Sequence, residues 1–272
     1  MEWTITMACT IDPGLMADKL EIAKDVKNLL EYARTLGMTE VAADAASGKP
    51  SKRAASTKAG PSSDERDGPA PIKAGGKATL TPAEKASSLE SLRAKEIGNC
   101  TRCRLSDGRT NLVFGTGNPS AQLMFIGEGP GADEDKQGVP FVGRAGQLLT
   151  KIIEAMGLRR EEVYIANIVK CRPPQNRPPM PDEVKSCIPF LVCQARIVSP
   201  KAIVCLGSVA TQNLLGTEEK ITKLRGRFTE WNGIPVMPTY HPAFLLRNPN
   251  MKKPVWEDMQ SVMALLGLGD KK

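Results

Sequence analysis

Four short apolar segments alternate with helical patterns along the second half of the chain, and this alternation restricts the possible folds more than any other feature. The apolar segments have the length and composition of buried strands, and they cover residues 123–126, 163–169, 202–206 and 234–240. Helical patterns lie between them at residues 144–156, 181–198 and 208–215. We therefore predict an α/β fold in which helices cover both faces of a four-stranded, mostly parallel sheet.

A glycine-rich turn follows the first predicted strand and carries a carboxylate. In the sequence GEGPG, Gly127 and Gly129 allow the backbone to turn tightly and to approach a ligand, and Glu128 lies at the end of the strand. The spacing is not that of a dinucleotide-binding motif, and no Gly-Lys-Ser/Thr follows to form a phosphate loop. Ordinary nucleotide cofactors are therefore disfavoured.

Polar residues also lie at or near the ends of the other predicted strands. They are Asn167, Ser208 and His241, which is the single histidine of the chain. In open α/β sheets ligands bind at the carboxyl ends of the strands, so we predict one active site there. A single histidine excludes a zinc site built from several histidines.

The cysteines indicate a second site. Cys100 and Cys103 form a C-x2-C pair, and Cys171 and Cys187 flank a proline-rich loop that could bring them to the first pair. Four thiolates suit tetrahedral zinc or an iron–sulfur cluster, and the spacing alone does not separate these two.

Composition divides the chain into three parts. Residues 1–40 contain an amphipathic pattern over 19–36, which predicts an accessory helix that packs on the body or binds a partner protein. Residues 41–86 are mostly Ala, Ser, Gly, Pro and Lys, which predicts a disordered linker. Residues 87–272 are expected to form the folded domain.

Charge and cysteine content indicate the surroundings of this domain. Residues 1–95 carry 14 Lys and Arg against 13 Asp and Glu, so most of the net charge of +7 lies in residues 96–272. A basic folded domain suits a polyanion such as nucleic acid. Seven cysteines, an odd number, with no secretion signal and no membrane-spanning segment predict a cytoplasmic protein without a membrane partner.

Three segments resemble the motifs of family 4 uracil-DNA glycosylases, the iron–sulfur type: GEGPGADEDKQGVPFVGRAGQLL, NIVKCRPPQNRPP and HPAFLLRNP. The resemblance covers residues 88–267. It implies a three-layer α/β/α sandwich around a four-stranded parallel sheet, and a monomeric enzyme that excises uracil from single- or double-stranded DNA in base excision repair. It also implies that the cysteines hold a [4Fe-4S] cluster, on Cys100, Cys103, Cys171 and Cys187. A DNA-repair protein would be a suitable partner for the N-terminal helix.

The same resemblance implies how the base is recognised. Phe141 is expected to stack on the flipped base. Asn167 is expected to read uracil, because its amide matches the O4 and N3–H edge, whereas cytosine reverses that pattern.

Three groups are candidates for catalysis under this resemblance. His241 is expected to hydrogen-bond uracil O2 as negative charge develops, with help from the backbone N–H groups around Gly127 to Gly129. Glu128 is the first candidate for positioning the attacking water and stabilising the sugar cation. Glu134 is its rival.

The loop tip Leu245-Leu246-Arg247 is expected to enter or follow the minor groove, with one of the two leucines filling the gap left by the flipped nucleotide. Ser208 is expected to cap a helix and could contact a phosphate. Three basic side chains near the cysteines could track the DNA backbone: Lys170, Arg172 and Arg177.

One alternative stays open, and two others are disfavoured by the sequence. A non-catalytic DNA-binding iron–sulfur protein of the same fold would also explain the basic charge. A relative that becomes covalently linked to uracil-DNA would need a basic, histidine-bearing insert, and the corresponding segment DKQGVPF has none. A cytosolic iron–sulfur electron carrier would leave the polar residues at the strand ends unexplained.

Overall fold

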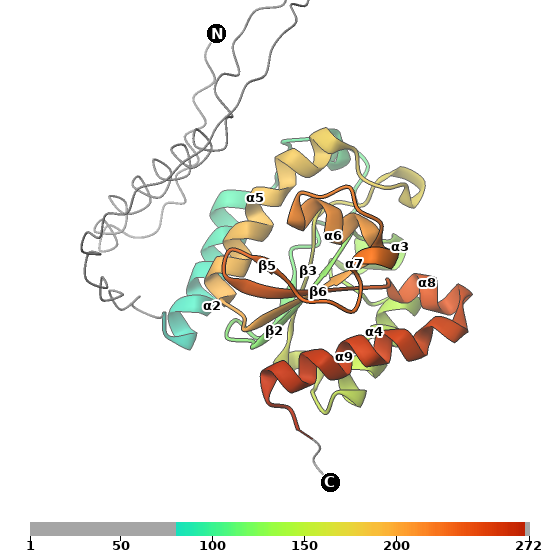
Figure 1. Cartoon of the computed structure of the whole chain (residues 1–272). Helices are drawn as coiled ribbons and strands as arrows, with labels where there is room; N and C mark the ends of the chain where they lie inside the picture. The colour runs from blue at the N-terminus through green and yellow to red at the C-terminus, as the bar shows by residue number, and fades with distance from the viewer. Residues whose placement is uncertain (1–79, 270–272) are drawn as a thin grey trace, which may run out of the picture. The chain divides into compact units, whose positions relative to one another are not determined.

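The computed structural model describes residues 80–269 of the chain (Figure 1). The predicted accessory segment, 1–40, and most of the predicted linker, 41–86, lie outside these residues. The first described helix is α2 (Pro82–Ser91). Thr81 caps it, because its hydroxyl accepts a hydrogen bond from Glu84 N at 3.3 Å while the Glu84 carboxylate accepts one from Thr81 N. This helix begins before the predicted domain boundary at residue 87.

A six-stranded sheet with the order β1-β3-β2-β4-β6-β5 forms the centre of the fold. Its strands are β1 (Thr116–Gly117), β2 (Leu123–Gly127), β3 (Tyr164–Asn167), β4 (Ala202–Leu206), β5 (Thr229–Trp231) and β6 (Ile234–Thr239). The four predicted strands are β2, β3, β4 and β6, and each pairs in parallel with its neighbours among them. The prediction of a mostly parallel sheet is confirmed. The predicted number of strands was too low, because β1 and β5 add antiparallel edges.

A turn motif in the sequence, Asn232-Gly233, could have predicted the missed strand β5. The strand joins β6 through Asn232 and Gly233, whose φ angles are 51° and 77°. A tight hairpin turn needs positive φ at both central positions, and Asn-Gly is the pair that tolerates it best. β1 has only two residues, so it produces no periodic pattern.

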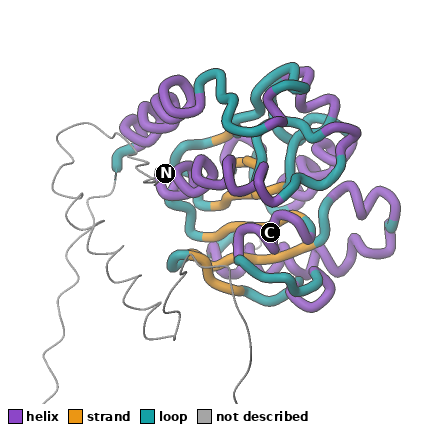
Figure 2. Tube along the Cα trace, turned by 90° about the horizontal axis from the view of Figure 1, so that it is seen from above, coloured by secondary structure: helices purple, strands orange, loops and turns teal. Residues whose placement is uncertain are grey.

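Helices cover both faces of this sheet (Figures 1 and 2). Successive side chains of β2 point to opposite faces, so Met124 and Ile126 belong to one core cluster and Leu123 and Phe125 to the other. The first cluster packs against α2, α5 (Pro181–Val198) and α6 (Ser208–Leu215). The second packs against α4 (Arg144–Ala155), α8 (Pro242–Arg247) and α9 (Lys252–Leu266).

The predicted helices agree with α4, α5 and α6 to within one residue. The other helical segments are η2 (Leu92–Ile97), η3 (Arg104–Ser106), α3 (Ala132–Gln137), η4 (Arg160–Glu162), η5 (Pro174–Asn176), α7 (Ile221–Leu224) and η6 (Pro249–Met251). Among residues 80–269, no helix has the length and apolar character needed to cross a bilayer.

Candidate active site

The carboxyl ends of the four parallel strands meet at one edge of the sheet. Gly127 at the end of β2 is paired with Asn167 at the end of β3. Gly207 follows β4, and its N–H donates to the carbonyl of Thr239 in β6 at an N···O distance of 2.8 Å. A Cβ atom on Gly207 would lie 3.0 Å from the Cβ of His241. Residues far apart in the sequence are thus brought together at this edge.

Phe141 and Asn167 flank Gly127 so closely that only glycine fits between them. A Cβ atom on Gly127 would lie 2.5 Å from Phe141 Cζ and 2.5 Å from Asn167 Oδ1. The ring of Phe141 also lies 5.6 Å from the ring of His241, centroid to centroid. An aromatic ring, an amide and an imidazole therefore surround one small region.

The backbone of Phe141 is held in a conformation that side chains rarely adopt, with φ of 53°. Two contacts maintain it. The Arg160 guanidinium donates to the carbonyl of Pro140 at 2.6 Å, and Gly146 of α4 lies so close to the Phe141 carbonyl that a Cβ atom there would overlap it. Strained residues persist where the surrounding structure holds them, and they cluster at functional sites.

Glu134 also holds this loop. Its Oε1 accepts hydrogen bonds from Val142 N and Gly143 N, both at 2.9 Å, and its Oε2 accepts one from Gly131 N at 3.1 Å. Oε1 therefore holds the backbone next to Phe141, and Oε2 holds the backbone before α3. This geometry favours a positioning role for Glu134 over the rival catalytic role that we predict from the sequence.

Asn167 carries a buried acceptor without a partner. The residue is 1% exposed, and its Oδ1 accepts no hydrogen bond from any described residue. The other described side chain with such an atom is Ser120, in the turn before β2 at the opposite end of that strand. An unsatisfied buried acceptor costs about 1–3 kcal/mol, so a bound water or ligand that supplies a donor would stabilise this arrangement.

His241 is presented as a neutral hydrogen-bond donor. It caps α8, and its Nδ1 accepts a hydrogen bond from Ala243 N at 3.1 Å, so the proton of the neutral ring lies on Nε2. Burial, with a smaller contribution from the Arg247 cation, lowers the pKa of His241 to about 4, and Glu134 opposes this shift. The ring is therefore uncharged at neutral pH.

Glu128 follows Gly127 at the end of β2. Its carbonyl accepts a hydrogen bond from Val169 N at 3.2 Å, which extends the contact between β2 and β3 beyond the strands. A Cβ atom on the neighbouring Gly129 would lie 2.8 Å from Val169 Cγ2, so Gly129 also packs closely against the segment that follows β3. Burial raises the pKa of the Glu128 carboxyl, which makes its carboxylate a stronger base.

Two sequence predictions are corrected by the structure. Gly207, not Ser208, occupies the N-cap of α6, and no side chain caps that helix. Leu245 is 1% exposed and packs in the core beneath α8, so it is not available to DNA. Leu246 is 38% exposed and Arg247 is exposed, and both can reach a ligand outside.

One cavity is lined by all four predicted ligand cysteines: Cys100, Cys103, Cys171 and Cys187. Three N–H donors point at the sulfurs: the Arg109 guanidinium lies 3.2 Å from Cys171 Sγ, Lys170 N lies 3.3 Å from Cys187 Sγ, and the Arg102 guanidinium lies 3.9 Å from Cys100 Sγ. Burial raises the pKa of the Cys171 thiol, and it raises that of Cys187 to about 11. Donors to sulfur are the usual outer contacts of metal-bound thiolates. Within residues 80–269, no three His, Cys, Asp or Glu side chains lie close enough together to hold a single metal ion.

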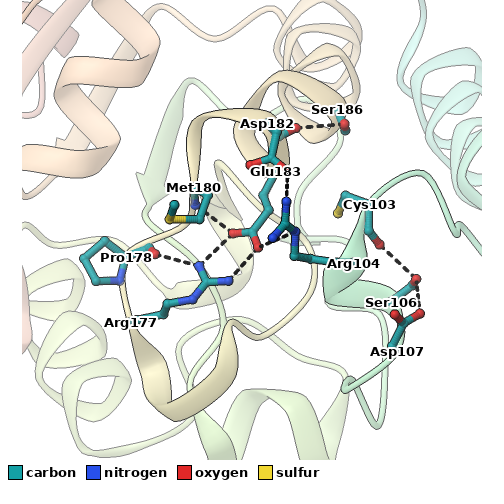
Figure 3. Close-up of polar contacts among 10 residues, drawn as sticks. All are labelled: Cys103, Arg104, Ser106, Asp107, Arg177, Pro178, Met180, Asp182, Glu183 and Ser186. Carbon is teal, nitrogen blue, oxygen red and sulfur yellow. Dashed lines mark hydrogen bonds and ion pairs between the residues drawn. The ribbon is translucent and has the colours of Figure 1, made fainter.

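Ion pairs join the two cysteine segments (Figure 3). Arg177 donates to both carboxylate oxygens of the buried Glu183, at 2.8 Å and 2.6 Å. Arg104, next to Cys103, pairs with Asp182 at 2.7 Å. The pairing with Glu183 gives Arg177 a structural role in the loop between Cys171 and Cys187, and its contact with DNA stays a prediction.

Lys170 is buried, which contradicts its predicted contact with the DNA backbone. It is 1% exposed, and its Nζ donates to the carbonyl of Asn167 at 2.8 Å and to Gln194 Oε1 at 2.6 Å. Gln194 in turn donates to Tyr164 Oη at 3.2 Å and to the carbonyl of Phe114 at 2.9 Å. The sequence gives no signal for this network, because a lysine between a valine and a cysteine looks like an ordinary surface cation.

Comparison with known proteins agrees with this geometry. The family model of the uracil DNA glycosylase superfamily matches residues 114–260. This range contains the strand ends, Phe141, the loop between Cys171 and Cys187, and His241. The C-x2-C pair at Cys100 and Cys103 lies before it.

Curated relatives extend the match. A type-4 uracil-DNA glycosylase of Thermotoga maritima is 45% identical over 182 residues, which cover 65% of this chain and 95% of that protein. Type-4 uracil-DNA glycosylases of Saccharolobus solfataricus and Archaeoglobus fulgidus are 47% and 44% identical, over 64% of this chain and 85% and 91% of their own lengths. A type-5 uracil-DNA glycosylase of Pyrobaculum aerophilum is 32% identical over 47% of this chain and 63% of that protein. The chain therefore belongs to the uracil-DNA glycosylase superfamily, among its type-4 members.

Proposed function

We propose that this protein is a uracil-DNA glycosylase that hydrolyses the N-glycosidic bond of uracil in DNA, and so initiates base excision repair. The unpaired Oδ1 of Asn167 is the observation that carries the proposal. It lies close to the ring of Phe141, because both approach the place where a side chain on Gly127 would begin. Uracil offers the missing donor, its N3–H, on the edge of a planar ring that can stack on the phenyl group.

Base selection follows from the same amide. Asn167 presents a donor and an acceptor side by side, which match O4 and N3–H of uracil. Cytosine places an acceptor opposite Oδ1 and a donor opposite Nδ2, so buried polar groups would stay unpaired. Sites built to hydrogen-bond one pattern reject the other by about 10⁴-fold. The base reaches the site only after it leaves the stack, which costs a few kcal/mol that contacts with DNA offset.

The chemistry needs stabilisation of two charges. When the bond between C1′ and N1 breaks, its electron pair leaves with uracil, and positive charge remains on the sugar. The neutral His241 donates from Nε2 to uracil O2, where the negative charge gathers. The Glu128 carboxylate orients a water molecule, takes its proton as the oxygen bonds to C1′, and stabilises the sugar cation until then. The proton on Glu128 passes through solvent to the uracil anion, so the products are free uracil and an abasic site.

The four cysteines suit a [4Fe-4S] cluster in this proposal. A cavity lined by four cysteines that do not converge on one metal ion fits a group with several irons better than a single zinc. The cluster would supply a covalent tie between the segment of Cys100 and Cys103 and the loop from Cys171 to Cys187. The ion pair of Arg104 with Asp182 strengthens the same connection.

Leu246 is the wedge that fills the gap left by uracil, with Arg247 beside it. Leu246→Ala should lower kcat/KM for uracil in double-stranded DNA by about tenfold, while the free energy of unfolding changes by less than about 0.5 kcal/mol. Leu245→Ala is the matched control, because it opens a core cavity and should cost about 2–5 kcal/mol of stability. Excision assays and chemical denaturation of both variants check this. A destabilised Leu246→Ala with unchanged kcat/KM would contradict the assignment.

The pH dependence should reflect the lowered pKa of His241. Since that pKa is about 4, the profile of kcat/KM should show no step near the ordinary histidine value of about 6.5. The acidic loss of activity should instead follow protonation of Glu128, whose pKa is raised from the ordinary carboxyl range. The unfolded chain binds a proton at His241 more readily than the folded protein. The free energy of unfolding should therefore decrease as pH falls from about 6.5 towards about 4. A midpoint of activity near 6.5 that His241→Asn removes would contradict a neutral histidine.

The direct test uses the full-length protein and oligonucleotides that contain one uracil, in single- and double-stranded form. Release of free uracil, and strand breaks after alkali treatment, are expected. Oligonucleotides with thymine or cytosine at the same position are the controls and should stay intact. Tight binding of uracil-DNA without uracil release would leave the non-catalytic DNA-binding alternative.

A further inference from the structure

Lys170 lies between the uracil-reading residue and the cysteine cavity. Its ammonium donates to the carbonyl of Asn167 at 2.8 Å, and its own backbone N–H donates to Cys187 Sγ at 3.3 Å. Lys170 is thus anchored at the cysteine site through its backbone and holds the end of β3 through its side chain. The hydrogen bonds of the ammonium to Asn167 and Gln194 both go to neutral oxygens.

A buried lysine in this position is costly. Removing an ammonium from water is unfavourable unless an opposite charge or hydrogen bonds compensate, and methionine would fill a similar volume without that cost. What lysine adds is two charge-assisted hydrogen bonds of fixed direction. Gln194 sets that direction, because its amide is held by the carbonyl of Phe114 at 2.9 Å; the contact with Tyr164 Oη, at 3.2 Å, is longer and secondary.

The held carbonyl belongs to the residue whose side chain reads the base. Asn167 is the last residue of β3, and its amide must meet uracil within a few tenths of an ångström. Misplacement of a reading group by about 1 Å can cost about 10²-fold in rate. We propose that Lys170 is a positioning residue that orients Asn167 for uracil through its hydrogen bond to the Asn167 carbonyl. This inference rests on the proposed function.

The test compares Lys170→Met with Tyr164→Phe in the full-length protein. The first change removes the bond to Asn167, and the second removes a bond at the far end of the same buried network without touching Asn167. The readouts are inhibition by free uracil, kcat/KM on uracil-DNA, affinity for undamaged DNA, and the visible absorbance of the iron–sulfur group. In Lys170→Met, inhibition by uracil and kcat/KM should both weaken by about tenfold or more, with DNA affinity and absorbance unchanged. In Tyr164→Phe, all four should stay within about threefold.

Gln194→Met is a second variant for the case that Lys170→Met does not fold. It releases the ammonium from one of its two partners, so it should weaken inhibition by uracil in the same direction but by less. The inference would be overturned if the folded variants show unchanged inhibition by uracil, or if Lys170→Met and Tyr164→Phe show equal losses. The proposed function would still stand in that case, provided that the wild-type protein excises uracil. A wild-type protein that neither releases nor binds uracil would overturn both.

Discussion

Asn167→Ala should lower kcat/KM for uracil excision by about 10²–10⁴-fold, the largest loss expected from any single change in this protein. The variant removes both hydrogen bonds to the base, and it leaves uracil O4 and N3–H buried without partners. Because these bonds form when the flipped base is bound, inhibition by free uracil should weaken as well. Steady-state excision kinetics and inhibition by uracil measure the two effects.

Asn213→Ala is the matched control for this change. Asn213 lies on α6, and its side chain donates to the carbonyl of Val209 within the same helix. Its replacement should leave uracil excision within about twofold. Retention of excision by Asn167→Ala to within tenfold would contradict the assignment of Asn167 as the reader of uracil. The unpaired acceptor would then need another explanation.

His241→Ala should lower kcat by about 10²–10³-fold with little change in KM. The hydrogen bond from Nε2 strengthens only as negative charge gathers on uracil O2, so its loss affects the transition state more than substrate binding. Single-turnover excision at saturating enzyme separates this chemical step from binding.

Two further variants separate catalysis from helix capping. His241 also caps α8, and loss of a cap costs about 1 kcal/mol of stability. Asparagine can cap a helix but is too short to present a donor where Nε2 lies, so His241→Asn should keep stability while it loses kcat. A variant that instead raises KM with unchanged kcat would show that His241 binds the substrate and does not act in the chemical step.

The fold followed from local patterns to a large extent. The strands β2, β3, β4 and β6 are short apolar runs, and α4, α5 and α6 repeat with the period of a helix, so their residues alone determine their type. Parallel strands then place their carboxyl ends at one edge. For this reason Gly127, Asn167 and His241 could be assigned to one region before the structure was known. Their proposed roles in binding and catalysis stay predictions.

The two edge strands were not predicted, because they produce little periodic pattern in the sequence. β1 has two residues and exists only because Thr116 and Gly117 meet β3. β5 has a half-exposed, irregular pattern and was detectable only through the Asn-Gly turn that follows it.

The sequence by itself determined the order of the chemical groups along the chain: a carboxylate, an amide and an imidazole at the ends of three strands, and two pairs of cysteines. Only the tertiary structure decided which side chains are free to act. The Glu134 carboxylate accepts hydrogen bonds from the backbone of Gly131 and Val142. Leu245 is buried, whereas Leu246 is exposed. Lys170 is buried and donates a hydrogen bond to the carbonyl of Asn167. The reason is physical: propensity and periodicity depend on neighbours in the sequence, whereas burial and hydrogen bonding depend on segments that meet only when the chain folds.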